Sequence, residues 1–196
     1  MAVLSTFCKI IGKAISEPKI IVVVRSSGLI MLDIRELLKY NEDVRHKYFD
    51  SFMKLSWSEF TKNREASFHS IRNIFVHILG TIDYFLDFLQ KEDLRFKREF
   101  DDYKNFEDVR AYMEHVEKRM DDYLSSLSLE ELNKAYTITA DDAKTFEVTA
   151  EDVLFHVFEE DIYHRGELNA LLWQMGIDPP LPTLKEYLQY AHSTSR

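Results

Sequence analysis

The sequence is poor in cysteine and in the residues that interrupt helices. Its 196 residues include five glycines and four prolines, which is unusual for a chain built from many short strands and turns. The one cysteine, Cys8, has no second cysteine to pair with, so a disulfide within the chain is excluded. A single cysteine is typical of a reducing compartment. We therefore expect a mainly α-helical protein in the cytoplasm.

The sequence also lacks long apolar runs and basic stretches. No run approaches the roughly 20 apolar residues that a membrane-spanning helix needs, and we find no secretory signal pattern. The net charge is −9, and no stripe rich in lysine and arginine offsets it. An acidic surface repels phosphate groups. We therefore expect neither a membrane nor a nucleic acid as a partner.

Residues 1–30 differ in charge from the rest of the chain. They contain four basic residues and one acidic residue, and "KIIVVVR" (19–25) is β-like. Met31 stands immediately before the first strong helical pattern. We interpret 1–30 as an N-terminal extension and 31–196 as the functional domain. An edge strand or loop packed on the domain is the alternative.

Four long segments have apolar residues at helical spacing. They are 32–55, 67–90, 107–127 and the segment from Thr149 to about Gly176. The first pattern is interrupted at Asn41. Ser67 or Ser70 is a plausible cap for the second segment, and "TAED" at 149–152 resembles a capping box.

The segment between the third and fourth patterns is irregular. A short helical turn is expected at 129–133, and "AYTIT" and "TFEVT" can pair as a small β-ribbon around "ADDAK". "TLKEYLQYAH" predicts a short terminal helix. The fold class is therefore all-α: a four-helix bundle with an irregular crossover before the last long helix and a short C-terminal helix. Gly166, inside that last helix, predicts that another element approaches its backbone closely.

Three side chains that can bind metals lie four residues apart in "FHVFEEDIYHRGELNALLWQMG" (155–176). A step of four residues turns only about 40° around a helix, so His156, Glu160 and His164 share one apolar face. His156 and His164 are about 12 Å apart along the axis, at about 1.5 Å per residue, which is too far for one ion. Glu160 and His164 therefore form the candidate ligand pair. His156 could orient a ligand or relay a proton, or it could simply be a buried histidine.

His77 is the candidate ligand from a second helix. It lies in the apolar stripe of "SIRNIFVHILGTIDYF", where a buried imidazole needs partners for its ring nitrogens. A single core histidine is more often structural, but a facing histidine–carboxylate pair makes a metal site plausible. A di-iron bundle is excluded, because it needs two Glu-x-x-His motifs and this spacing is Glu-x-x-x-His.

Two segments resemble the signature segments of the DinB/YfiT-like family: "SIRNIFVHILGTIDYFL" and "LFHVFEEDIYHRGELNALLWQMGIDPP". The resemblance covers about residues 31–178. It implies a four-helix bundle, often a homodimer, with one divalent metal on three histidines. By position these correspond to His77, residue 160 and His164. This chain departs from the pattern, because residue 160 is glutamate.

Two imidazoles and one carboxylate can hold zinc, nickel, iron(II) or manganese. The glutamate could equally mark a member that has lost its metal, with Glu160 paired to Arg72 or to a histidine. An ion with an open coordination position could activate water or hold a thiolate.

Two functions of different classes follow from this sequence. The first is a metal-dependent hydrolase or thiol S-transferase that acts on a small electrophilic molecule in stress or detoxification, with a low-molecular-weight thiol as possible cosubstrate. The second is a non-catalytic bundle whose site is structural, senses a ligand or is empty. A fourth protein ligand, such as His69 or His156, would favour the second function, because a closed coordination sphere leaves no place for substrate.

Overall fold

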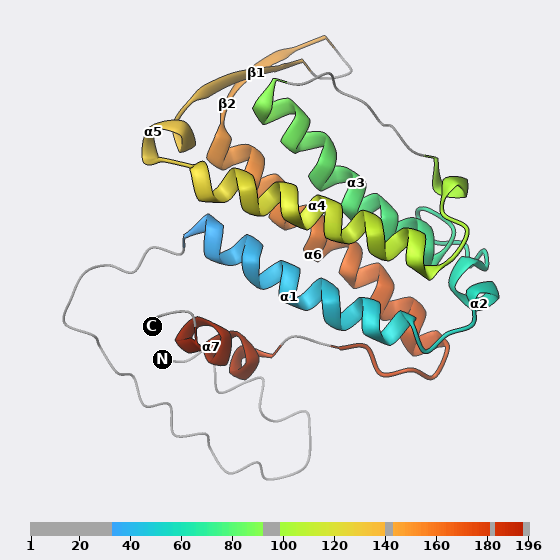
Figure 1. The fold of residues 1–196 in the computed structure, drawn as a ribbon. Coiled ribbons are helices and arrows are strands. Elements are labelled where there is room, and N and C mark those ends of the chain that lie inside the picture. The colour runs from blue at the N-terminus through green and yellow to red at the C-terminus, as the bar shows by residue number, and fades with distance from the viewer. Residues whose placement is uncertain (1–32, 92–98, 140–142, 181–182, 194–196) are drawn as a thin grey trace, which may run out of the picture. The chain divides into compact units, whose positions relative to one another are not determined.

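The computed structural model describes residues 33–91, 99–139, 143–180 and 183–193 (Figure 1). The proposed N-terminal extension, 1–30, lies outside the described residues. Four long helices account for most of the described chain. They are α1 (Ile34–Phe52), α3 (Ile71–Gln90), α4 (Phe106–Ser126) and α6 (Ala150–Gln174). No helix in the described part of the chain is long and apolar enough to cross a membrane.

The four long helices form a bundle, which confirms the predicted fold class. Helix α3 packs against both α4 and α6, and α1 packs against α6 (Figure 1). The apolar stripes of the four helices meet in one core, and Phe75 of α3 is fully buried between Phe49 and Phe52 of α1. Burial of these stripes is the main driving force for the fold.

Short helices connect or extend the bundle. They are α2 (Trp57–Thr61), the 3₁₀ turn η2 (Phe100–Asp102), α5 (Leu129–Leu132) and α7 (Leu184–Ser193). Helix α7, the predicted terminal helix, packs on α1, where Tyr187 meets the ring of Tyr40 edge to face at 5.1 Å.

The predicted crossover is also confirmed. Strands β1 (Ala135–Thr139) and β2 (Thr145–Thr149) form an antiparallel ribbon in which Ile138 is opposite Phe146. Tyr136 fastens the ribbon to the bundle, because its buried hydroxyl donates a hydrogen bond to the carbonyl oxygen of Leu89 at the end of α3. The ribbon therefore lies over the C-terminal end of α3 and leads directly into α6 (Figure 1).

The structure explains the interrupted apolar pattern of the first helix and contradicts one other prediction. Helix α1 continues through Asn41, which is buried and whose side chain binds Arg165 and the carbonyl oxygen of Phe158. Gly166 does not mark a close approach within the chain. A Cβ at that exposed position would have no described atom within 4 Å.

Candidate metal centre

The helices that carry the candidate ligands begin at well-defined caps. The Ser70 side chain accepts a hydrogen bond from the Asn73 amide at the start of α3, which then carries His77. Thr149 and Asp152 form the predicted capping box at the start of α6, which carries Glu160 and His164. A capped N-terminus fixes where the helical phase begins, and hence which side chains point toward the neighbouring helix.

The structure brings His77, Glu160 and His164 together between α3 and α6. One potential ligand atom from each residue lies within 4.8 Å of the other two. The Glu160 Oε2 atom is 3.3 Å from the His164 Nε2 atom and 3.7 Å from the His77 Nε2 atom. The two imidazole rings meet edge to face, with 4.6 Å between their centroids.

His164 is oriented by a second carboxylate. Its Nδ1 atom is 2.8 Å from the Glu167 Oε2 atom, and the same oxygen accepts a hydrogen bond from the Ser67 hydroxyl at 2.7 Å. If the Nδ1 nitrogen carries the proton, Nε2 presents its lone pair to Glu160 and His77. Glu167 follows His164 by three residues, a spacing that identifies it as a helical neighbour, but it is not among the site residues predicted from the sequence.

The Phe68 ring contacts both histidines. It stacks on the ring of His77 with 4.0 Å between centroids, and it lies 5.5 Å from that of His164. Phe68 comes from the loop before α3, so this loop contributes both an apolar wall and, through Ser67, a polar contact. Helical periodicity could not reveal either contribution, because the loop has no repeating pattern.

Burial and the neighbouring charges shift two pKa values at this site. Burial, and then the proximity of His164, lowers the pKa of His77, although Glu160 opposes the shift. Burial alone would raise the pKa of Glu167, but the hydrogen bonds from Ser67 and His164 outweigh it, and the pKa is lowered. Both shifts favour the forms that a metal site needs, namely a neutral imidazole and a carboxylate.

The residues fit a divalent metal ion. Metal–ligand bonds of about 2.0–2.2 Å place neighbouring tetrahedral ligand atoms about 3.4 Å apart, close to the separations of Glu160 from the two histidines. Two imidazoles and one carboxylate are a common ligand set for divalent metals in proteins. A carboxylate on the Nδ1 nitrogen, as at His164, is typical of metal-binding histidines. Among the described residues this cluster contains three potential ligands, and its side chains are 6–29% exposed.

The other candidates lie elsewhere. His156 is exposed and meets the ring of Phe85 edge to face at 5.1 Å; its described contacts do not include the three candidate ligands. His69 is exposed in the loop before α3, and Glu159 of α6 is also exposed. Neither histidine is in the three-residue cluster. Arg72, considered as a partner of Glu160, binds Asp101 and the carbonyl oxygen of Tyr103 instead.

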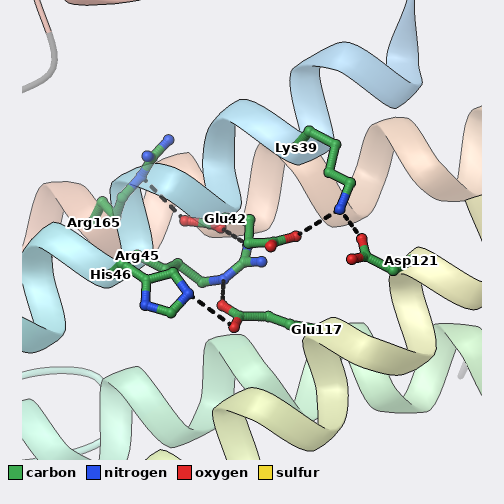
Figure 2. Close-up of polar contacts among 8 residues, drawn as sticks. Lys39, Glu42, Arg45, His46, Glu117, Asp121 and Arg165 are labelled. Carbon is green, nitrogen blue, oxygen red and sulfur yellow. Dashed lines mark hydrogen bonds and ion pairs between the residues drawn. The ribbon is translucent and has the colours of Figure 1, made fainter. Parts of the chain in front are cut away.

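A network of buried charges lies on the other side of α6, between α6, α1 and α4 (Figure 2). Asp161 accepts a hydrogen bond from Arg45 at 2.7 Å and forms an ion pair with Arg165 at 3.1 Å. Arg45 is also 3.7 Å from Glu117 of α4. Because Asp161 and Arg165 directly follow the two α6 candidate ligands, the network fixes the rotation of α6 that turns Glu160 and His164 toward α3.

A second group of potential ligands borders this network. His46 Nε2 lies 3.0 Å from Glu117 Oε2, and Glu42 lies beside them (Figure 2). Burial raises the pKa of Glu117, although Arg45 and His46 oppose the shift. The charges of Glu42 and Glu117 already have partners in Lys39 and Arg45, so this group is better explained as part of the ion-pair network.

The fold is a four-helix bundle, and a His–Glu–His cluster lies between α3 and α6, where bundle proteins build metal sites from facing helices. The DinB family model matches residues 28–195, and this chain belongs to the DinB family. Metal binding is general in this family, and the His–Glu–His cluster is a possible site for it. A search of curated proteins found no match.

Two solved structures show the same fold. A DinB-like protein from Bacillus subtilis has a TM-score of 0.57 at 19% sequence identity, over 76% of this chain and 96% of that one. A DinB-like protein from Bacillus cereus has a TM-score of 0.58 at 17% identity, over 76% of this chain and 95% of that one.

Proposed function

We propose that this protein is a divalent-metal-dependent enzyme that acts on a small electrophilic substrate, either by hydrolysis or by transfer of a thiol. The observation that carries the proposal is the cluster of His77, Glu160 and His164, which offers three ligands and remains partly exposed. A structural site is usually closed by a fourth protein ligand, whereas a catalytic site keeps a position open. The described part of the chain brings no fourth ligand to the cluster.

The roles of the residues follow from their positions. His77, Glu160 and His164 would hold the ion, and Glu167 would keep the Nε2 atom of His164 directed at it. A divalent ion supplies Lewis acidity, which lowers the pKa of a nucleophile and polarises an electrophile. In the thiol-transfer reaction the sulfur forms a bond to the electrophilic carbon. The leaving group departs with its bonding electron pair, and the thiol proton passes to solvent.

Elemental analysis tests metal binding directly. Protein purified without a histidine tag should contain about one zinc, nickel, iron or manganese ion per chain. Glu160→Ala and His164→Ala should lose it, and Glu159→Ala, which changes an exposed carboxylate one residue away, should keep it. Wild-type protein that contains no metal, and takes up none when each ion is added, would contradict the proposal.

Catalysis is tested with two model reactions of the metal-loaded protein. One is the hydrolysis of 4-nitrophenyl acetate, and the other is the addition of glutathione, cysteine or coenzyme A to 1-chloro-2,4-dinitrobenzene with release of chloride. We expect a rate above background that falls at least tenfold in Glu160→Ala and is unchanged in Glu159→Ala. Equal rates in wild type and Glu160→Ala would exclude these activities at this site.

One observation favours a second candidate function, a non-catalytic bundle. The Glu160 carboxylate lies between two imidazoles at 3.3 and 3.7 Å and could satisfy them without an ion. In that case Glu160→His, which restores the three-histidine pattern implied by the family resemblance, would create zinc binding that the wild type lacks. If the wild type already binds zinc, the enzyme function is favoured.

The outer face of α6 supports the homodimer implied by the resemblance. Phe155, Ile162 and Trp173 are 45–54% exposed, and their spacing of seven and eleven residues places them on one stripe. Exposed apolar patches commonly mark protein interfaces. We expect Ile162→Glu to convert a dimer to a monomer in sedimentation equilibrium. A wild-type protein that is monomeric at all concentrations would contradict this assembly.

A further inference from the structure

A largely apolar cavity of about 610 Å³ lies between the C-terminal half of α3, the β-ribbon and the first turns of α6. Its wall includes these side chains: Phe85, Phe88, Ile138, Val148, Val153 and His156. Ligand-binding sites in proteins are usually cavities of about 300–1,000 Å³ with apolar walls and a few polar groups. The size and the lining of this cavity therefore match those of a site for a small molecule.

The cavity continues the same helix seam that holds the candidate metal ligands. Phe85 follows His77 by eight residues on α3, and His156 precedes Glu160 by four residues on α6. The rings of Phe85 and His156 are 5.1 Å apart, and those of His77 and His164 are 4.6 Å apart. Helices α3 and α6 run antiparallel along this contact. The cavity therefore lies one helical turn, about 6 Å along the axis, from Glu160 on α6 and two turns from His77 on α3.

The lining favours an uncharged occupant. The described wall contains no lysine or arginine, and its carboxylate, Asp152, is held by the Thr149 amide and hydroxyl at 2.7 Å. An anionic group would face Asp152 without a cation to balance it. The wall also includes polar groups that can hydrogen-bond to a ligand, among them the His156 imidazole and the hydroxyl groups of Thr137, Thr139 and Tyr84. This gives His156, which the sequence analysis singled out, a different role from contact with the metal ligands.

We propose that this cavity binds the uncharged, aromatic or aliphatic body of the substrate, whose reacting end extends along the α3–α6 seam toward His77, Glu160 and His164. The inference rests on the proposed function for its assignment to a substrate. The occupancy of the cavity, however, can be measured without any metal. The chemical class is a small amphipathic molecule: an apolar body carrying one polar, electrophilic end.

Binding is tested on the metal-free full chain with 2-naphthol, by NMR of protein labelled at its isoleucine and valine methyl groups. Saturable shifts are expected at the methyl groups of Ile138, Val148 and Val153, and not at Val109, which is buried in α4 away from the cavity. Naphthalene-2-sulfonate has the same rings with a negative charge and should bind at least tenfold more weakly. Absence of shifts at the three cavity residues, or tighter binding of the sulfonate, would overturn the proposal.

Filling the cavity provides the matched variants. Val148→Trp and Thr137→Trp each place an indole in the ribbon wall, and Thr137 is exposed, so the second variant does not disturb the core. Both should weaken 2-naphthol binding at least tenfold, whereas Ser125→Trp, at an exposed site on α4, should leave it unchanged. Unchanged binding in a folded Thr137→Trp protein would contradict the location.

The direction of the bound molecule is tested with naphthalene-2-thiol. If the reacting end reaches the candidate ligands, the thiol should bind at least tenfold more tightly to zinc-loaded protein than to metal-free protein, and 2-naphthol should show a smaller difference. Equal affinities for the thiol in a protein proven to contain zinc would refute the connection between the cavity and the cluster. A protein that binds 2-naphthol but no metal would retain the cavity site and contradict the proposed function instead.

Discussion

His164 is the candidate ligand that its neighbours hold most firmly. Its side chain is 6% exposed, its ring lies against Phe68 and His77, and its Nδ1 atom faces Glu167. A carboxylate at this position selects the tautomer and holds the ring in one orientation. Glu167 is in turn held by Ser67, so a residue of the loop before α3 contributes indirectly to the candidate metal centre.

The first prediction follows from this contact. Glu167→Ala should lower zinc affinity about 10–100-fold, because removing the hydrogen-bond partner of a metal-binding histidine weakens its orientation and basicity. Competition with a chelating dye measures the affinity, and Glu159→Ala is the control for loss of one acidic residue from α6. An affinity equal to that of the wild type would show that Glu167 does not support the site.

Tyr123 leads to a prediction about pH. Its hydroxyl is buried without a hydrogen-bond partner in the described structure, and burial raises its pKa to about 12. In the unfolded chain the phenol ionises near its ordinary pKa of about 10. The unfolded state therefore gains stability as pH rises from about 10 to 12, and the contribution of Tyr123 to folding is lost over that range.

Tyr123→Phe should remove this decrease in stability at high pH. It should not destabilise the protein at neutral pH, since no hydrogen bond is broken. Urea unfolding at pH 7 and at several values up to pH 11 provides the comparison with wild type. At pH 7 the free energies of unfolding of the two proteins should agree within about 1 kcal/mol. Above pH 10 the free energy of unfolding of the variant should decrease less steeply than that of the wild type. A steeper fall in the variant would contradict the assignment.

At the scale of a single element, three sides of α6 have different surroundings. One side carries Glu160 and His164 toward α3, a second carries Asp161 and Arg165 into the buried network, and the outer side exposes an apolar stripe. A helix with polar groups on two buried sides lacks a simple amphipathic pattern. For this reason the apolar periodicity of α6 located the helix and the face that carries Glu160 and His164, but not the second buried side that carries Asp161 and Arg165.

Gly166 allows the exposed side of α6 to be tested. Since no described atom lies within 4 Å of a Cβ built at this position, Gly166→Ala should stabilise the helix by about 1 kcal/mol through helix propensity. The comparison is made by urea unfolding in the Ile162→Glu background, where the proposed dimer is absent. Gly176→Ala is the opposite control and should destabilise, because Gly176 has a φ of +73°.

A loss of stability in the Gly166→Ala, Ile162→Glu protein would contradict open space at this position. Gly166→Ala could instead raise the free energy of unfolding in the Ile162→Glu background but lower it in the otherwise wild-type chain. That result would show that a second chain packs against Gly166. The two backgrounds therefore separate the conformation of one chain from its assembly.

At the scale of the whole molecule, the buried charge network joins three of the four long helices. Asp161 is 1% exposed, and Arg45 and Arg165 are 3% and 7% exposed. Charges of this kind are costly to bury, but each is far more costly to leave without its partner. The network therefore opposes any rotation of α6 relative to α1 and α4 that would separate these groups (Figure 2).

Removal of the central carboxylate should reveal this cost. Asp161→Ala should lower the free energy of unfolding by about 3–5 kcal/mol, because two buried guanidinium groups lose a partner. Asp121→Ala, which breaks the ion pair between Asp121 and Lys39 on the exposed surface, should cost less than about 1 kcal/mol. Urea unfolding gives both values, and a similar small effect for both variants would contradict the structural role of the network.

The sequence by itself determined the helices, the crossover and the candidate ligands. Apolar spacing located α1, α3, α4 and α6, and local hydrogen-bonding residues such as Thr149 and Asp152 located their ends. These features depend on residues within one or two turns of each other, so a linear pattern records them. The combination of His77 with Glu160 and His164 was inferred from the apolar stripe around His77 and strengthened by the family resemblance, because periodicity does not specify which helices are neighbours.

Only the tertiary structure decided how distant residues meet. It placed Ser67, Phe68 and Glu167 around the imidazoles, and it put His156 on a separate cavity. It also explained Asn41, which interrupts an apolar stripe because it binds Arg165 across 124 positions of sequence. Such contacts form when separate helices pack at particular rotations, and the energy of a buried hydrogen bond or ion pair depends on the partner that packing supplies. No local pattern contains that information.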